Sequence, residues 1–397
     1  MSRPPVLVLT PRLPWPLDDG GRIAAWQCVW AASRAYEPTL VSLVSPGEDV
    51  APLPPVFGRH GVRVIRVPHR PPGNLAGAWE GLFGRWPYTL ARYRNPELPG
   101  VLRGLVAETH PRLAIVNHLH MATYIEDLGD VPVVLREHNL EHVWMKRYAQ
   151  RLGWMPAGIY ARTQVKRLRE AEAALARKAS LVLAIQPGEA AELSRMAPGV
   201  RTEVLPVGVD LSQYAEPRPG EPPIVLLAGS FVWKPNVDGA IRFMRQGWPR
   251  VMARVPRARL RVVGKAPPRS LRRAADEIGV EVVGYVDSMA EEFARATVFV
   301  VPLWVGAGVR VKIVEAMAAR VPVAATRLAA EGLGVEAGVH YAAGDTPGEL
   351  GGQVATLLLS PAVREVFQQR GRALVEGRWA QDIVADLQNS LCAGVAQ

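Results

Sequence analysis

The chain has 397 residues, of which 49% are hydrophobic, and a formal net charge of +10. This length exceeds what one hydrophobic core usually serves, so we expect two domains. No run approaches the roughly 18 to 20 apolar residues of a membrane span, and the N-terminus shows no signal-peptide pattern. The two cysteines, Cys28 and Cys392, provide neither a disulfide framework nor a metal site. Together these features favour a soluble protein of the reducing cytoplasm.

The positive charge comes mostly from arginine spread along the chain, which indicates a solvated surface more than a nucleic-acid site. Lysine is rare, at six residues. Three of the six, Lys234, Lys265 and Lys312, fall in Gly/Pro-flanked loops directly after apolar runs. We therefore treat these three as candidate ligand groups.

An apolar run at residues 6–10 predicts a buried strand, and a loop with the double glycine Gly20-Gly21 follows it before a helix expected to begin near Ile23. Because glycine allows tight turns with exposed N–H groups, this is either a phosphate-facing loop or a simple glycine-assisted helix start. Further strands are predicted at residues 39–43, 62–65, 113–116 and 131–135. Strands that alternate with helix-length segments indicate a parallel sheet.

Two segments of the first half combine basic with apolar residues. Residues 79–94 are rich in aromatics and arginine, and either receive an amphiphilic or sugar-containing acceptor or form a packed surface helix, which we favour. Residues 160–178 have the spacing of a basic amphipathic helix, for which a solvated face is the simpler interpretation.

Polar clusters follow two of the predicted strands. Residues 117–120, Asn-His-Leu-His, come after the strand ending at Val116, and residues 136–139, Arg-Glu-His-Asn, after the strand ending at Leu135. Ligands of open α/β sheets bind outside the carboxyl ends of strands. A single histidine is usually structural, but two clusters at equivalent strand ends favour a site.

A second α/β series begins after the Pro- and Gly-rich segment 214–223, the best linker in the chain. Its strands are predicted at residues 224–228, 261–264, 281–284, 298–301 and 323–325. The loops after the first four of these strands contain glycine and should converge along one edge of a sheet.

The most informative loop follows the run at residues 298–302 and carries Arg310 and Lys312 before a helix with Glu315 in its early turns. Glycines, a helix N-terminus and two cations suit a phosphate, and a carboxylate accepts hydrogen bonds from vicinal hydroxyls such as those of ribose. From the local sequence alone, an ordinary strand–loop–helix connection is about equally compatible.

Three motifs carry a family resemblance: Gly229-Ser230…Trp233-x-Pro235-Asn236-x-Asp238-Gly239, then Gly284-Tyr285-Val286, and Gly306-x-Gly308-x-Arg310-x-Lys312-x-x-Glu315-Ala316-Met317. They resemble the retaining, nucleotide-sugar-dependent glycosyltransferases of the GT-B fold, in particular the bacterial exopolysaccharide branch. Residues 19–22, the His118 region and residues 137–139 also match that family, so the resemblance covers nearly the whole chain. It implies an α/β architecture of two Rossmann-like domains whose parallel sheets face each other across a cleft.

The resemblance also implies roles for individual residues. The catalytic candidates are His118, Lys312 and Arg310, and the acceptor-binding candidates are Arg22, Glu137, His138 and Asn139. The donor-binding candidates are Gly20, Gly21, Gly229, Lys234, Lys265, Val286, Gly308 and Glu315. In this assignment Glu315 binds the ribose, the cations hold the diphosphate, the Gly20-Gly21 backbone approaches it from the other domain, and His118 lies at the donor sugar.

One departure concerns position 307, where many relatives carry a glutamate and this chain has Ala307. The sugar contacts of that glutamate are therefore absent or come from elsewhere. The departure keeps a non-catalytic sugar-nucleotide-binding protein open as an alternative, beside a GT-B epimerase.

The expected partners are a UDP- or GDP-sugar and a glycan or lipid-linked acceptor, with peripheral membrane contact as an option and no nucleic acid. We expect no cofactor and no metal, because there is no Asp-x-Asp signature and fixed cations can stabilise the departing diphosphate.

The expected domains are residues 1–207 for the acceptor and 224–376 for the nucleotide sugar, joined by the linker 208–223. Residues 377–397 are expected to be helical and either cross back to the N-terminal domain or pack on their own domain.

Overall fold

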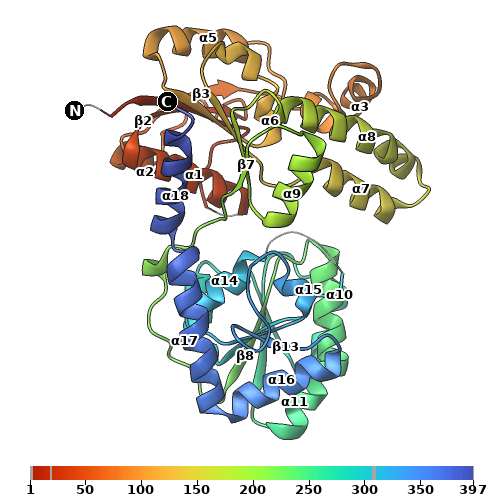
Figure 1. Cartoon of the computed structure of the whole chain (residues 1–397). Helices are drawn as coiled ribbons and strands as arrows, with labels where there is room; N and C mark the ends of the chain where they lie inside the picture. The colour runs from red at the N-terminus through yellow and green to blue at the C-terminus, as the bar shows by residue number, and fades with distance from the viewer. Residues whose placement is uncertain (1–2, 18–19, 306–309, 397) are drawn as a thin grey trace. The chain divides into compact units, whose positions relative to one another are not determined.

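The computed structural model describes residues 3–17, 20–305 and 310–396. The chain divides into two compact units: unit 1 is Met1–Gly208 with Val384–Gln397, and unit 2 is Val209–Ile383. Each unit contains one parallel sheet with helices on both faces (Figure 1). The predicted α/β class with two parallel sheets is therefore confirmed. No helix in the described ranges is both long enough and apolar enough to cross a bilayer.

The sheet of unit 1 has the strand order β3-β2-β1-β4-β5-β6-β7. Its strands are β1 Pro5–Thr10, β2 Glu37–Val44, β3 Arg63–Pro68, β4 Leu113–Asn117, β5 Val133–Arg136, β6 Leu181–Ala184 and β7 Thr202–Val204. Its helices are α1 Gly20–Ala35, α2 Pro55–Arg59, α3 Asn74–Phe83, α4 Tyr88–Ala91, α5 Leu98–Thr109, α6 Leu119–Ala122, the 3-10 turn Ile125–Leu128, α7 Glu141–Leu152, α8 Pro156–Ala176 and α9 Pro187–Met196. The order reverses between β1 and β4, so the loops after these two neighbouring strands lie at a topological switch point.

Alternate residues of each strand pack on opposite faces of this sheet. Leu7 and Leu9 of β1 belong to the core covered by α5, α6 and α8, whereas Val6 and Val8 pack against α1 and α2. Because both faces are covered at the centre of the sheet, β1, β4 and β5 are nearly continuous apolar runs, and this explains why they were predictable from sequence.

The last helix, α18 Gln381–Ala393, carries the chain into unit 1, since residues from Val384 onward belong to that unit. Its buried Gln388 donates from Nε2 to the Cys28 carbonyl at 3.0 Å and accepts from Arg136 Nη1 at 3.1 Å. Arg136 is 1% exposed and also donates to the Pro206 carbonyl at 3.3 Å. These neutral acceptors offset the cost of burying a guanidinium, whose pKa burial lowers.

The sheet of unit 2 has the order β10-β9-β8-β11-β12-β13. Its strands are β8 Ile224–Ala228, β9 Arg259–Val263, β10 Glu281–Gly284, β11 Val298–Val301, β12 Val323–Ala325 and β13 Ala342–Ala343. Its helices are the 3-10 turn Leu211–Gln213, α10 Lys234–Arg242, the π-turn Phe243–Gly247, α11 Trp248–Arg254, α12 Arg269–Asp276, α13 Met289–Arg295, α14 Val311–Ala318, α15 Arg327–Ala330, α16 Pro347–Leu359 and α17 Pro361–Arg378. Val225 and Leu227 face the core of α10, α11 and α16, and Leu226 faces the core of α13 and α14.

Several boundaries differ from the sequence expectation. Helix α1 begins at Gly20 rather than near Ile23, and β13, with two residues, was not predicted because it is too short to show a pattern. The helix expected at residues 160–178 is α8, and α7 pairs with it as a long hairpin that the sequence analysis did not identify.

Candidate functional site

The two predicted polar clusters of unit 1 meet at the carboxyl ends of β4 and β5, which are adjacent in the sheet. The His118 ring stacks on the His138 ring with centroids 3.6 Å apart and an interplanar angle of 27°. His138 Nε2 lies 2.6 Å from Asn117 Oδ1, which places the proton on Nε2. His118 has φ 72° and ψ 142°, a strained backbone conformation for a residue with a side chain.

The histidines of this cluster are neutral at pH 7. Burial lowers the pKa of His118 well below its usual range, and His120, Arg12 and Arg136 lower it further. Burial is also the main cause for His138, followed by His118 and Arg136. The pKa of His120 falls to about 4 through burial alone. The half-buried His118 and His120 rings can therefore exchange hydrogen bonds with a ligand, but they carry no charge.

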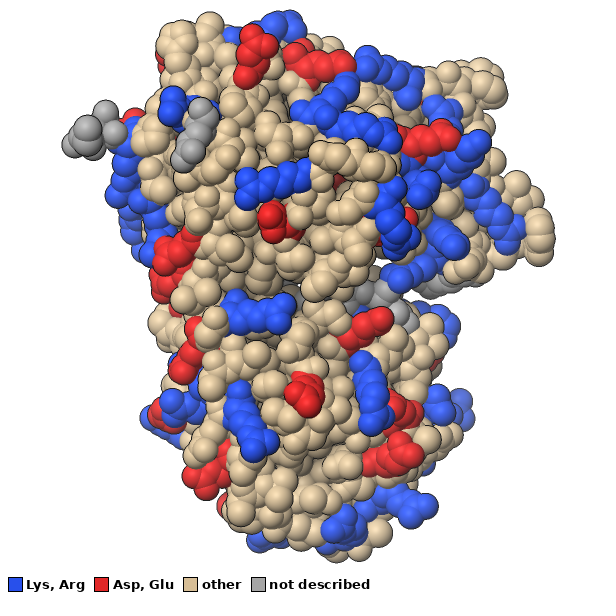
Figure 2. Space-filling model, in the orientation of Figure 1, with Lys and Arg blue, Asp and Glu red and all other residues tan. Residues whose placement is uncertain are grey.

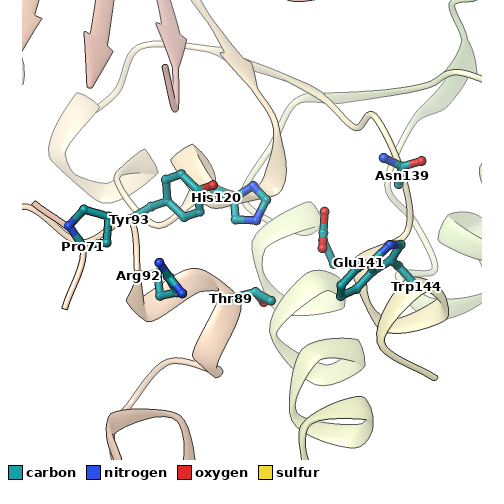
Figure 3. Close-up of a pocket in the computed structure, with 8 residues that line it drawn as sticks. All are labelled: Pro71, Thr89, Arg92, Tyr93, His120, Asn139, Glu141 and Trp144. Atoms are coloured by element: carbon teal, nitrogen blue, oxygen red, sulfur yellow. The ribbon is translucent and has the colours of Figure 1, made fainter. Parts of the chain in front are cut away.

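A pocket of about 390 Å³ opens beside the cluster (Figure 3). It is lined by Pro71, Thr89, Arg92, Tyr93, His120, Asn139, Glu141 and Trp144. The Tyr93 and His120 rings lie side by side with centroids 4.4 Å apart, and Glu141 and Trp144 project from the first turn of α7. Aromatic faces with a carboxyl, an amide and a guanidinium suit a ligand rich in hydroxyl groups.

Carboxyl groups gather behind this pocket. The buried Glu172 accepts from the Glu141 backbone N–H at 2.6 Å and from His142 Nδ1. Burial raises the pKa of Glu141 to about 7, with a further contribution from Glu172. Burial also raises the pKa of Glu137 well above its usual range, and Glu172 and Glu141 add to this. Both carboxyls therefore keep their protons to higher pH than an exposed glutamate does.

We expect Glu141→Gln to change how stability depends on pH. An unfolded glutamate loses its proton near pH 4.3, whereas folded Glu141 keeps it to about pH 7, so wild-type stability falls as pH rises between these values. Glutamine mimics the protonated form and avoids this loss, so the variant should gain on the order of 2 kcal/mol relative to wild type between pH 5 and pH 8. Thermal denaturation at both pH values measures it.

The matched control is Glu170→Gln, since the Glu170 side chain is exposed on α8 beside Lys166. This variant should follow the wild-type curve at both pH values. A constant difference between Glu141→Gln and wild type across the range would contradict the assignment.

The predicted acceptor residues fall in different environments. Asn139 is exposed and lines the pocket, whereas His138 is buried and bonded to Asn117. Glu137 is 1% exposed and does not line the pocket. Gly20, Gly21 and Arg22 form the first turn of α1, after β1, the neighbour of β4.

Five of the eight pocket residues fall in segments that the sequence singles out, whereas Pro71, Glu141 and Trp144 do not. Arg92 and Tyr93 belong to the aromatic and basic segment at residues 79–94, and Glu141 and Trp144 begin a helix that carried no motif. The aromatic and arginine content was a usable signal, but only the packing of the connection after α4 near the end of β4 shows where those side chains lie.

In unit 2, backbone bonds connect the loops that follow the neighbouring strands β8, β9 and β10. Gly229 donates to the Val263 carbonyl at 3.1 Å, Phe231 to the Lys265 carbonyl at 3.0 Å, and Gly264 to the Gly284 carbonyl at 2.7 Å. A Cβ on Gly264 would lie 1.8 Å from the Gly229 carbonyl oxygen, so glycine is required there. The result is a backbone surface that a ligand can approach closely.

Arg310, the residue directly before α14, lies beside this surface. The Arg310 guanidinium carbon lies 5.7 Å from the centre of the Trp233 ring, in the loop after β8. Lys312 Nζ lies 3.8 Å from Glu315 Oε2, and both residues are in the first turns of α14. Glu315 Oε2 accepts no hydrogen bond from any described residue. A buried carboxylate oxygen in that condition is suited to a hydroxyl donor from a ligand.

The other residues predicted to bind the sugar donor follow or precede the same strands of unit 2. Lys234, the first residue of α10, pairs with Asp238 at 2.6 Å, and its side chain is exposed. Lys265 is exposed, and Val286 follows β10 and is half-buried. Gly308 lies outside the described residues. In the described part of the chain, no three His, Cys, Asp or Glu residues are grouped as they would be to hold a metal ion.

Solved structures with two such sheets match the whole chain. Sucrose-phosphate synthase from Thermosynechococcus elongatus is 19% identical, with a TM-score of 0.72 and 99% of each chain covered. Anabaena HepE in complex with UDP-glucose is 14% identical, with a TM-score of 0.66, over 99% of this chain and 100% of that one. The α,α-trehalose 6-phosphate synthase from Burkholderia multivorans is 13% identical, with a TM-score of 0.65 and the same coverage.

The chain has the GT-B fold. Residues 222–360 match the model of the family Glycosyl transferases group 1. This segment of the GT-B chain includes Gly229, Arg310, Lys312 and Glu315, the residues at the carboxyl edge of the second sheet. No curated protein matches the chain in sequence.

Proposed function

We propose that the protein is a glycosyltransferase that moves a sugar from a nucleotide-sugar donor to a hydroxyl of a glycan or lipid-linked acceptor. The observation that carries this proposal is the group formed by Arg310, Lys312 and Glu315 at the start of α14, inside the segment that matches the glycosyl transferase family. The structure of HepE with UDP-glucose, a protein of similar fold, supports a nucleotide-sugar donor.

In this proposal unit 2 binds the donor. Arg310 and Lys312 neutralise the diphosphate, helped by the partial positive charge at the N-terminus of α14. The half-buried Glu315 accepts hydrogen bonds from the ribose hydroxyls, and the Gly229 backbone allows close approach. Lys234 is placed to help only if it exchanges its partner Asp238 for phosphate.

The chemical step follows from where charge develops. The bond from the anomeric carbon to the phosphate oxygen breaks, a bond from that carbon to the acceptor oxygen forms, and the acceptor proton passes to the departing phosphate. The leaving diphosphate gains negative charge, which fixed cations stabilise without reorganisation. We infer retention of configuration by attack on the face that the phosphate leaves, and independence of a metal ion.

Unit 1 binds the acceptor in this proposal, through the pocket of about 390 Å³ that Asn139, Glu141 and Trp144 line. His118, neutral and stacked on His138, is suited to hydrogen-bond a sugar hydroxyl. The family resemblance supports a role in cell-surface polysaccharide synthesis on the cytoplasmic side of a membrane.

A screen of UDP-, GDP- and ADP-sugars tests this function. We expect slow release of the nucleoside diphosphate from one donor class without acceptor, a rate that chelator leaves nearly unchanged, and loss of the activity in Glu315→Gln. Loss of activity in EDTA that Mg²⁺ or Mn²⁺ restores would show that a metal, not the protein cations, stabilises the leaving group. Tight binding of a donor without any turnover would favour a non-catalytic binding protein instead.

A further inference from the structure

Helix α3 of unit 1 turns its small residues inward and its large apolar side chains outward. Gly77 and Gly81 are its buried residues, and a Cβ on Gly81 would lie 2.4 Å from the Tyr160 hydroxyl of α8. The outward residues are Leu75, Trp79, Leu82 and Phe83, which are 90%, 68%, 38% and 69% exposed. Their spacing of four, three and one places them on one face. An apolar helix face in water indicates a surface that another body covers.

The turn between α7 and α8, taken with the first turn of α8, adds further exposed apolar side chains: Trp154 at 81%, Met155 at 61% and, in α8, Ile159 at 49%. Helix α8 holds α3 beside it, because the Tyr160 hydroxyl donates to the Ala78 carbonyl at 3.1 Å and Gln164 Nε2 to the Gly81 carbonyl at 3.0 Å. We name the seven exposed residues of α3 and this turn the apolar ridge. Figure 1 shows α3, α7 and α8 together at one end of unit 1.

Cations are numerous on α7 and α8, the two helices that the turn of the apolar ridge connects, whereas α3 itself carries one charged residue, Glu80. Residues 141–176 contain seven Lys or Arg and three Glu, and of these carboxylates Glu172 is fully buried. Figure 2 shows Lys and Arg side chains gathered over the part of unit 1 that holds α7 and α8. The exposed cations among them are Lys146, Arg147, Arg162, Lys166 and Arg169. The Arg162 guanidinium lies 4.1 Å from the centre of the Trp154 ring.

We propose that the apolar ridge is a membrane-docking surface that inserts into the interfacial region of an anionic phospholipid bilayer. Tryptophan and phenylalanine partition into that region, and basic side chains on neighbouring helices add electrostatic attraction to anionic lipid. The surplus of exposed cations is complementary to anionic head groups. This charge complementarity favours lipid over a second copy of the chain, which would place like charges opposite one another.

The position of the pocket supports this assignment and, resting on the proposed function, deepens it. Trp144 lines the pocket and is 51% exposed on α7, where it stacks on Tyr148 with centroids 5.3 Å apart. At the other side of the pocket, Arg92 donates to Asn74, the first residue of α3, at 3.5 Å. The pocket is therefore lined by α7, the helix that leads into the turn of the ridge, and its Arg92 bonds to the first residue of α3. This arrangement suits an acceptor whose polar head enters from a bilayer surface.

Co-sedimentation of the full chain with phospholipid vesicles tests the proposal. We expect binding to phosphatidylcholine vesicles that contain about one third phosphatidylglycerol, and weaker binding to phosphatidylcholine alone. Trp79→Ala/Phe83→Ala should lower the partition constant about tenfold or more, because it removes two large exposed apolar side chains. Lys146→Glu/Lys166→Glu should weaken binding to the anionic vesicles only, and high salt should reduce the difference.

The matched control is Leu359→Ala/Val366→Ala, which removes exposed apolar side chains from unit 2 and should leave vesicle binding unchanged. Donor hydrolysis without lipid should be equal in all variants, which separates failure of docking from failure of the proposed function. The proposal is wrong if the wild-type protein binds to neither kind of vesicle. It is also wrong if Trp79→Ala/Phe83→Ala binds to the vesicles as the wild type does. Self-association that Trp79→Ala/Phe83→Ala abolishes, without vesicle binding, would identify the ridge as a dimer interface and also overturn it.

Discussion

Replacing Arg310 by alanine is expected to weaken the binding of UDP by about 10- to 150-fold, since a charge-assisted contact contributes roughly 1.5 to 3 kcal/mol. Lys312→Ala should have an effect of the same order. Binding of uridine, which lacks the diphosphate, should change little in either variant. Titration calorimetry with both ligands, or with GDP and guanosine if the donor screen selects that base, measures the difference.

Two further variants separate charge from structure. Arg310 contacts the Trp233 ring, so its removal also loses packing, whereas Arg310→Lys keeps a charge and should lose less affinity for UDP than Arg310→Ala. Arg273→Ala removes a largely exposed arginine of α12 in the same unit and should bind as wild type does. Equal losses for UDP and uridine in Arg310→Ala would refute the phosphate assignment.

The sheets were predictable because their central strands are buried on both faces. The run at residues 224–228 has no polar residue to break it, and the structure gives β8 the same bounds. Such strands leave a continuous apolar signal, and loops between them mark their ends. By contrast, β13 has two residues, and its place beside β12 depends on pairing that no local pattern encodes.

The candidate site was predictable where polar side chains come directly after a strand. His118 and His138 come after separate strands, and adjacency of β4 with β5 brings their rings to 3.6 Å. The sequence does not reveal this stacking, because it depends on strand order. Glu141 shows the same limit, since its pKa near 7 arises from burial and from Glu172, thirty-one positions further along the chain.

The apolar ridge shows what local sequence does not reveal about a packed helix. At residues 79–94 the sequence favours a packed surface helix over a segment that receives an acceptor, and it does not show which side of that helix is packed. In the structure the core side of α3 is taken by Gly77 and Gly81 against tyrosine side chains, which forces Trp79 and Phe83 outward. The sequence does show that Gly77 and Gly81 are four residues apart and therefore share one side of the helix. It does not show that tyrosine side chains pack on that side.

The second large effect is expected at Gly264, where alanine should destabilise unit 2 by about 3 kcal/mol or more. The residue has φ +156° and its Cβ would lie 1.8 Å from the Gly229 carbonyl oxygen, which is backbone and cannot rotate away. Its N–H also donates to the Gly284 carbonyl at 2.7 Å, so a shift of this residue disturbs the loops after β8, β9 and β10 together. Chemical denaturation measures the loss of stability.

Because those loops form the backbone surface beside Arg310, Gly264→Ala should also weaken UDP binding under conditions where the protein is still folded. Gly352→Ala is the matched control: it makes the same substitution in α16 of the same unit, where a Cβ meets no atom within 4 Å. Alanine there should stabilise the protein by roughly 0.5 to 1 kcal/mol, since glycine is unfavourable inside a helix. The prediction would be wrong if Gly264→Ala kept both the wild-type denaturation midpoint and the wild-type affinity for UDP. That result would show that the loops after β8 and β9 can move apart at no cost in stability. The close backbone approach at Gly264 would then have no part in forming the donor site.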